Sequence, residues 1–236
     1  MNILKKQERK MVFVAQIKES LANAIRKYVG EIPVLSVEDV EIHKNGSPLY
    51  DETVAHRIGL VPLKQTAVKK EGNVFKISSS KEGFVCAKEI VGEIEPIYED
   101  MPITYLDKGQ ELEITGRAVK GKGNDHSKFS PGNIFYRRAK KIILEKKVLD
   151  LIKKSCSDAE IKEKGDKIII LDDKEKEVGD LCEGIAEKEN SPIEIEEIDE
   201  LVLNIESFGQ IGPDEIFSGA VKALKKDIDE FLKRIK

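Results

Sequence analysis

One stretch of this 236-residue chain mimics the start of a phosphate-binding loop. Gly116 is followed by Gly121 and Lys122 at the spacing of a nucleotide-binding P-loop. Such a loop needs Ser or Thr directly after the lysine, to reach the magnesium ion, and a helix behind it. Here Gly123 follows instead, and residues 124–132 are polar and contain a proline. We therefore interpret the stretch as a glycine-rich turn after a strand.

The histidines and cysteines are too scattered to predict a metal or iron–sulfur site. Zinc and iron–sulfur centres draw their ligands from closely spaced pairs or runs. The residues concerned are His43, His56, His126, Cys86, Cys156 and Cys182. We expect no cofactor, no cluster and no metal. A small odd number of cysteines fits a reducing compartment, and a disulfide between Cys156 and Cys182 remains the alternative.

No set of residues predicts catalysis. The Gly-x-Ser-x-Gly pattern of a nucleophile is missing, and solvated faces explain the many carboxylates. The net charge of −4 and the lack of Trp argue against direct binding of nucleic acid. No run of about 18 apolar residues suggests a membrane span, and the start has no signal-peptide pattern. The chain is expected to be a cytoplasmic, non-catalytic protein that binds other proteins.

The periodicity predicts an α+β fold with helical ends and a β-rich middle. A strand is expected over 11–17, a helix over 19–29, an extended segment over 34–43 and a short helix over 51–58. Further strands are expected over 74–77, 89–97, 111–119 and 134–146. Glycine and proline breaks separate them.

Residues 153–200 differ from the rest. Between 160 and 200 there are 16 acidic and six basic residues, a net charge of −10. One strand is expected, over 167–171, and the remaining periodicity is weak. This acidic segment is interpreted as a solvent-facing insertion or a loosely packed minor domain.

The last part of the chain is a strand over 201–205 followed by a long helix. The helix begins at Pro213, with Asp214 and Glu215 in its first turn, and ends in basic residues. Its apolar face is broad. That face either covers the chain's own sheet or meets another subunit, because a core and an interface have the same pattern.

Four stretches together resemble one known family. They are NAIRK at 23–27, NGSPLYDETVAHRIGLVPL at 45–63, HSKFSPG at 126–132 and IESFGQIGPDEI at 205–216. They are similar to the D subunit of archaeal DNA-directed RNA polymerase, a relative of the bacterial alpha amino-terminal domain and of the third-largest subunit of eukaryotic RNA polymerase II. The resemblance covers residues 11–146 and 201–235.

The resemblance implies a discontinuous dimerisation domain, residues 1–38 plus 201–236, with a β-rich domain inserted over 39–152. The family's dimerisation domain pairs with the smaller subunit L. With the small subunits N and P, this heterodimer forms the platform on which the large catalytic subunits assemble. DNA would be met only indirectly, through the complex, and no membrane is involved.

On that basis, two sets of residues are candidate contacts. The partner-subunit interface would comprise Leu21, Ile25, Arg26, Tyr28, Phe217, Val221, Leu224 and Ile228, since obligate interfaces resemble a core cut in half. A family-motif surface would comprise Asp51, Glu52, His56, Arg57, His126 and Lys128. For residues 51–57, local capping and a surface pair are an equally good interpretation.

The acidic segment departs from the family pattern. Many members carry a ferredoxin-like insert with cluster-binding cysteines at this place. Residues 153–200 lack those cysteines. We interpret them as a reduced or degenerate insert without a cluster. A stand-alone enzyme and an iron–sulfur module are the competing classes, and each lacks the residues it needs.

Overall fold

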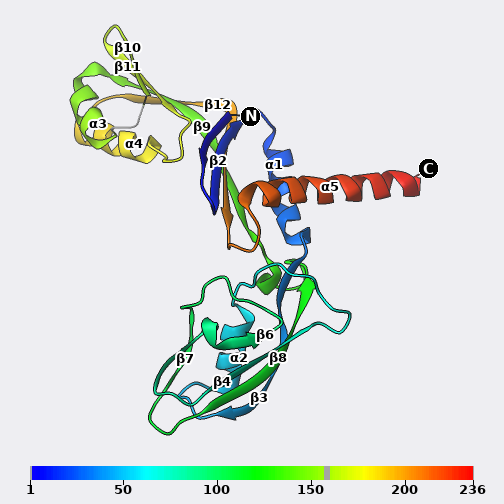
Figure 1. Ribbon diagram of the computed structural model, residues 1–236. Coiled ribbons are helices and arrows are strands. Elements are labelled where there is room, and N and C mark those ends of the chain that lie inside the picture. The colour runs from blue at the N-terminus through cyan, green and yellow to red at the C-terminus, as the bar shows by residue number, and fades with distance from the viewer. Residues whose placement is uncertain (1, 157–159, 236) are drawn as a thin grey trace. The chain divides into compact units, whose positions relative to one another are not determined.

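The computed structural model describes residues 2–156 and 160–235, which form two compact units (Figure 1). The first unit comprises Met1–Ala24 and Ile134–Glu206, and the second comprises Ile25–Asn133 and Ser207–Lys236. The predicted α+β class is confirmed. The predicted end of the inserted domain at residue 152 is not where the chain divides, because residues 134–145 belong to the sheet of the first unit.

The first unit is built on a six-stranded sheet in the order β1-β2-β12-β9-β11-β10. Its strands are β1 (Asn2–Lys6), β2 (Lys10–Ala15), β9 (Gly132–Glu145), β10 (Glu160–Lys164), β11 (Lys167–Asp172) and β12 (Ile193–Ser207). β2 and β12 are antiparallel, with Phe13 opposite Leu203 and Val14 opposite Val202. Apolar cross-strand pairs of this kind stabilise a sheet register. The sheet therefore joins its second strand in sequence, β2, directly to its last, β12.

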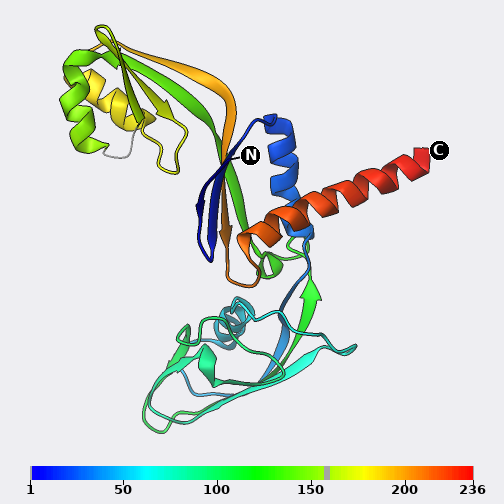
Figure 2. The same ribbon diagram turned by 45° about the horizontal axis from the view of Figure 1, so that its top comes forward.

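The acidic segment folds around a core of its own. Two helices, α3 (Leu149–Ser155) and α4 (Gly179–Lys188), lie next to the β10–β11 hairpin (Figure 2). Ile142, Ile152, Ile168, Ile170 and Cys182 are fully buried in this core. The expectation of a loosely packed segment is therefore wrong, because short elements too brief to show periodicity still bury a continuous apolar cluster.

Part of the negative charge of this segment is paired with the basic strand β9. Arg138 contacts Glu197 at 2.8 Å, and Lys141 contacts Glu196 at 2.6 Å. Also on β9, Arg137 pairs with an acid of β11, and Lys140 pairs with one in the loop that follows β11. Hydrogen bonding to the Lys140 ammonium lowers the pKa of Glu177 despite partial burial. Several acids of the segment are therefore engaged in ion pairs with the neighbouring strand.

One of these ion pairs is buried. The Asp172 side chain is fully covered and lies 2.9 Å from Nη2 of Arg137. Its other oxygen accepts the backbone N–H groups of Val178 and Gly179, each at 3.2 Å, where α4 begins. Asp172 therefore joins β9, β11 and the start of α4 and satisfies otherwise unpaired helix donors.

The three thiols are free and buried, so the alternative of a Cys156–Cys182 disulfide is wrong. Burial raises the pKa of Cys182 to about 12. Burial and then the Asp172 charge raise the pKa of Cys156. Both sulfurs are therefore protonated near neutral pH.

The second unit contains a four-stranded antiparallel sheet in the order β3-β8-β4-β6. The strands are β3 (Val34–Asn45), β4 (Asn73–Ser79), β6 (Ile90–Gly92) and β8 (Leu112–Gly121); β5 (Gly83–Cys86) and β7 (Pro102–Leu106) form a separate pair. Helix α2 (Asp51–Gly59) buries Val54 and Ile58 against Phe75 and Ile77 of the sheet (Figures 1 and 2). Short 3-10 turns are η1 (Val29–Glu31), η2 (Ala87–Glu89), η3 (Ser127–Phe129) and η4 (Lys146–Val148), the last in the first unit.

Two sequence expectations change here. The strand expected over 89–97 stops at Gly92, whose φ of +146° breaks the extended chain and whose Cα faces the Val74 carbonyl closely. Most of the glycine–lysine stretch, Gly116–Gly121, is the end of β8, and the predicted turn begins only at Lys122, whose carbonyl accepts the backbone N–H of Asp125. A Cβ on Gly116 would lie 2.5 Å from the Phe75 ring, and one on Gly121 would lie 2.6 Å from the Phe129 ring. These glycines make room for aromatic rings.

The helices predicted at the two ends are present. Helix α1 (Glu19–Tyr28) matches the helix expected over 19–29, and α5 (Pro213–Ile235) begins at the predicted proline. Within the described ranges, no helix is long and apolar enough to cross a membrane.

Replacing Asp172 tests the buried ion pair. We expect Asp172→Ala to lower the free energy of unfolding by about 3–5 kcal/mol, because Arg137 would keep a largely buried charge without its partner. Glu197→Gln removes the exposed ion pair with Arg138, a neighbour of Arg137 on β9. It should lower the free energy of unfolding by no more than about 1 kcal/mol. Urea unfolding followed by circular dichroism would measure both. Equal effects of the two changes would contradict this role of Asp172.

Thr104 offers the opposite test. Its hydroxyl oxygen is buried and has no hydrogen-bond partner in the described structure. Burying an unsatisfied hydroxyl costs free energy, so Thr104→Val should leave the midpoint of urea unfolding unchanged or raise it. A clear loss of stability would show that the hydroxyl has a partner.

Candidate partner interface

Helix α5 carries an apolar stripe that its own unit covers only in part. The stripe, here called the α5 seam, consists of Phe217, Val221, Leu224, Ile228, Phe231 and Ile235. These side chains alternate at spacings of four and three residues, which is the pattern of a helix packed lengthwise on another helix. Ile228 is 49% exposed, Phe231 63% and Ile235 65%. The seam becomes more exposed toward the C-terminal end.

The other side of α5 is attached to its own unit near the helix start. Ile216 and Ala220 are fully buried, and Gly219 lies against Ile32. The hydroxyl of Tyr28 donates to the Asp227 carboxylate at 2.8 Å. Beyond Asp227 every described residue of the helix is exposed. At 1.5 Å per residue the whole helix is about 35 Å long, so its second half offers a long free face.

The α1 residues predicted at the interface have different environments. Leu21 is 45% exposed, and Arg26 is also exposed. Ile25 is buried within the chain and therefore belongs to its own core rather than to a free surface. Tyr28 is partly buried beside α5. Of the predicted interface set, Phe217 and Leu224 are partly buried and Val221 and Ile228 are exposed.

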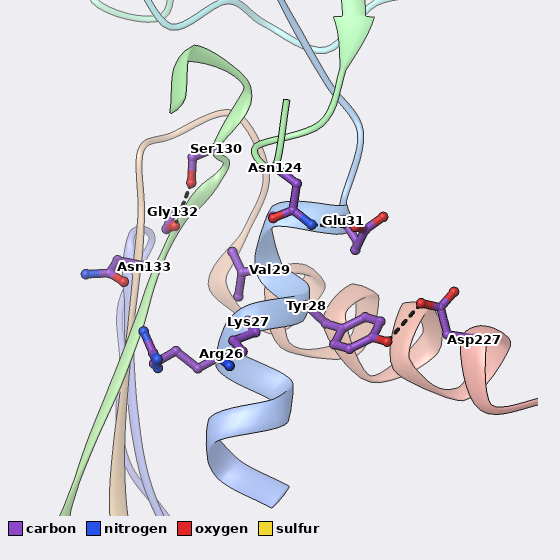
Figure 3. A pocket seen from close by; sticks show the side chains of 11 residues that line it. Arg26, Lys27, Tyr28, Val29, Glu31, Asn124, Ser130, Gly132, Asn133 and Asp227 are labelled. Atoms are coloured by element: carbon purple, nitrogen blue, oxygen red, sulfur yellow. Dashed lines mark hydrogen bonds between the residues drawn. The ribbon is translucent and has the colours of Figure 1, made fainter. Parts of the chain in front are cut away.

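Arg26 and Tyr28 line a pocket of about 530 Å³ between the end of α1, the loop before β9 and α5 (Figure 3). The acidic groups around it already have partners. Glu31 contacts Lys122 at 2.7 Å and is bonded to Asn124, and Asp227 accepts from Tyr28. The hydrogen bond to Asp227 raises the pKa of Tyr28. Asp227 lies one residue before Ile228. The hydrogen bond from Tyr28 to Asp227 therefore attaches α5 to the end of α1 just where the exposed half of the seam begins.

Part of the family-motif surface has a local structural role. Nδ2 of Asn45 donates to Asp51 at 2.7 Å and to the Leu49 carbonyl at 2.9 Å, which fixes the entry into α2. Nη1 of Arg57 donates to the Ile103 carbonyl at 3.0 Å and ties α2 to β7. Glu52 is exposed on the first turn. Asp51 and Arg57 thus have local structural contacts, but in the described structure no side chain caps the start of α2, where Tyr50 is the N-cap residue.

The other three motif residues come together although 70 residues of sequence separate them. His56, His126 and Lys128 line one pocket of about 370 Å³, which we call the histidine pocket. Nδ1 of His126 accepts the backbone N–H of Lys128 at 3.1 Å. The Lys128 ammonium lies 3.2 Å from a Glu38 carboxylate oxygen and 5.0 Å from the centre of the Phe129 ring.

Sequence reasoning missed three contributors to this pocket. Glu38 and Asp39 reach it from β3, and Leu60 reaches it from the end of α2. Leu60 could have been found, since it lies inside the long motif and is apolar directly after a helix-ending glycine. Glu38 and Asp39 could not be singled out from the sequence, because acidic residues on the polar side of any strand follow the same pattern.

No three His, Cys, Asp or Glu side chains are grouped to hold a metal ion within residues 2–156 and 160–235. The protonated, buried state of Cys156 and Cys182 also makes them poor thiolate ligands. The expectation that the chain has no cofactor stays a prediction.

The β-rich module defines the class of protein. Residues 40–134 match the family model described as the RNA polymerase Rpb3/RpoA insert domain. The chain is 29% identical to DNA-directed RNA polymerase subunit Rpo3 of Pyrococcus horikoshii, over 99% of this chain and 96% of the relative. It is 28% identical to Rpo3 of Methanocaldococcus jannaschii, over 95% of this chain and 89% of the relative. Rpo3 of Pyrococcus furiosus is also 28% identical, over 99% and 95%.

These matches confirm the resemblance seen in the sequence. The chain is similar to archaeal Rpo3, the D-type subunit, over nearly its whole length, and these matches support a subunit of DNA-directed RNA polymerase.

The bond between Tyr28 and Asp227 gives a pH-dependent prediction. A raised phenol pKa means that its stabilisation is complete below the unfolded pKa of about 10 and is lost as the pH rises through the folded pKa. Tyr28→Phe should therefore be less stable than the unchanged chain at pH 8, and the difference should shrink above pH about 10. Urea unfolding at both pH values would measure it. A difference that stays constant would show that the phenol proton is not involved.

Proposed function

We propose that the chain is a non-catalytic assembly subunit, which forms a heterodimer with the small subunit L through the α5 seam. This heterodimer is the platform on which the large catalytic subunits assemble for transcription. The small subunits N and P join the platform, DNA is met only through the complex, and the protein acts in the cytoplasm without a cofactor. The discontinuous dimerisation domain of residues 1–38 and 201–236 is part of the proposal.

The exposed half of the α5 seam is the observation that supports this proposal most strongly. Exposed apolar patches of contiguous side chains are rare on monomers and mark interaction sites. The four-and-three spacing fits a partner helix laid along α5, with each side chain inserted between those of the facing helix. The exposed Leu21 on α1 is a further apolar contact of the same kind.

Co-expression with the L subunit of the same genome tests the proposal. Size-exclusion chromatography with light scattering should give a one-to-one heterodimer. A chain that stays monomeric and well behaved beside L would contradict the dimerisation role.

Single substitutions on α5 locate the interface. Ile228→Glu should abolish or strongly weaken the heterodimer, by at least about tenfold in Kd, because a charge would be buried in an apolar interface. The matched control is Lys222→Glu, which makes a larger charge change on the same helix away from the seam. Isothermal titration of each variant with L measures the difference. Both residues are exposed in the free chain, so neither change should alter its circular dichroism spectrum. Equal weakening by both would place the interface elsewhere.

A further inference from the structure

Basic side chains border the exposed half of the α5 seam on both sides. Successive residues of a helix are turned by about 100°, so Lys225 and Arg234 lie about 80–100° from the centre of the stripe, one on each side. Their neighbours in sequence, Lys226 and Lys233, lie about 160–180° away, on the opposite side of the helix. All four residues are exposed. A chain that lies on the seam would therefore meet Lys225 and Arg234, here called the rim cations.

The rim cations are not neutralised by the protein itself. In residues 2–156 and 160–235, no ion pair joins Lys225 or Arg234 to an acid. Two acids of the same half of α5 are engaged elsewhere. Asp227 accepts a hydrogen bond from α1, and Glu230 lies 3.8 Å from Lys226 on the far side of the helix. The border of the seam is therefore positively charged.

The chain covers the two sides of the seam to different extents. On the side of Arg234, Ala220 is fully buried and Asp227 is bonded to α1. On the side of Lys225, Leu232 is 52% exposed and widens the apolar stripe. A partner helix is therefore expected to lie toward Lys225 and Leu232. An ammonium group removed from water beside apolar side chains is unfavourable unless an acid faces it.

A second copy of α5 does not supply that acid. When two antiparallel helices pack lengthwise, each flank of one helix faces the same flank of the other. On the flank of Lys225, a second copy would present Ser218, Lys225 and Leu232. In a parallel pair in register, Lys225 would face Ala220 of the second copy. Since Lys225 meets no acid in either direction, the seam fits a helix of another sequence better than a second copy.

We propose that the α5 seam selects a partner helix whose own apolar stripe is bordered by acidic residues, which form ion pairs with Lys225 and Arg234. The apolar side chains of the seam provide the buried area, and the rim cations determine which helix is accepted. This inference rests on the proposed function, because it needs a partner helix on the seam. It adds the charge by which that helix is distinguished from a second copy.

Charge reversal at matched positions tests the rim cations. The rim variant carries Lys225→Glu and Arg234→Glu, and the control variant carries Lys226→Glu and Lys233→Glu. Both change the net charge of α5 equally, and all four positions are exposed, so the circular dichroism spectra should be unchanged. Binding of each full-length chain to immobilised L is measured at about 0.1 M NaCl. We expect the rim variant to bind at least about tenfold more weakly, mainly through slower association, and the control variant to stay within about twofold of the unchanged chain.

The salt dependence gives a second readout. Raising NaCl to about 1 M shortens the Debye length from about 10 Å to about 3 Å. The ratio of the Kd values of the rim variant and the unchanged chain should then fall at least about threefold, whereas a misfolded variant would bind poorly at both salt concentrations. Equal binding of the rim and control variants, or a loss that salt does not reduce, would overturn this inference alone. An unchanged chain that does not bind L would overturn the proposed function and this inference with it.

Discussion

Antiparallel pairing of β2 with β12 places residues 11–15 beside residues 201–205. The β-rich module lies between α1 and β9, so the chain leaves this sheet after β2 and returns to it in β9. The acidic segment, between β9 and β12, adds β10 and β11 to the same sheet. Closing so long a loop costs entropy, and five consecutive cross-strand pairs of apolar or buried residues, ending in the Lys10–Glu206 ion pair, offset that cost. Both insertions can therefore vary without disturbing the joined chain ends.

The acidic segment is held by a small apolar core and by ion pairs to β9. β9 contributes both Ile142 and Leu144 to that core and basic side chains that pair with some of the acids. The Asp172 side chain is a fully buried acid of this segment. Each exposed ion pair contributes little to stability. We therefore infer that the apolar core and Asp172 contribute most to specifying the fold of this segment.

The long helices and the central strands could be predicted because each presents its period over many residues. The elements of the acidic segment could not, since α3 and β10 have only seven and five residues and their apolar positions are few. The motif 45–63 carried the resemblance, but it did not show which of its side chains have local roles. Asp51 accepts a hydrogen bond from the Asn45 side chain, whereas His56 lines a pocket with His126. Ile25 was predicted at the partner interface but is buried within the chain, because core and interface residues share one apolar pattern. Apolar spacing alone cannot show which face another chain will cover.

We propose that a partner chain covers the exposed half of α5. Hydrogen–deuterium exchange of the α5 amides, with and without L bound, would test this coverage. A helix end with no packing frays and exchanges quickly, while a packed helix is protected. We expect L to slow amide exchange over residues 224–235 at least about tenfold and to leave the exchange rates of the α2 amides unchanged. Unchanged exchange over 224–235 in a complex that does form would contradict it.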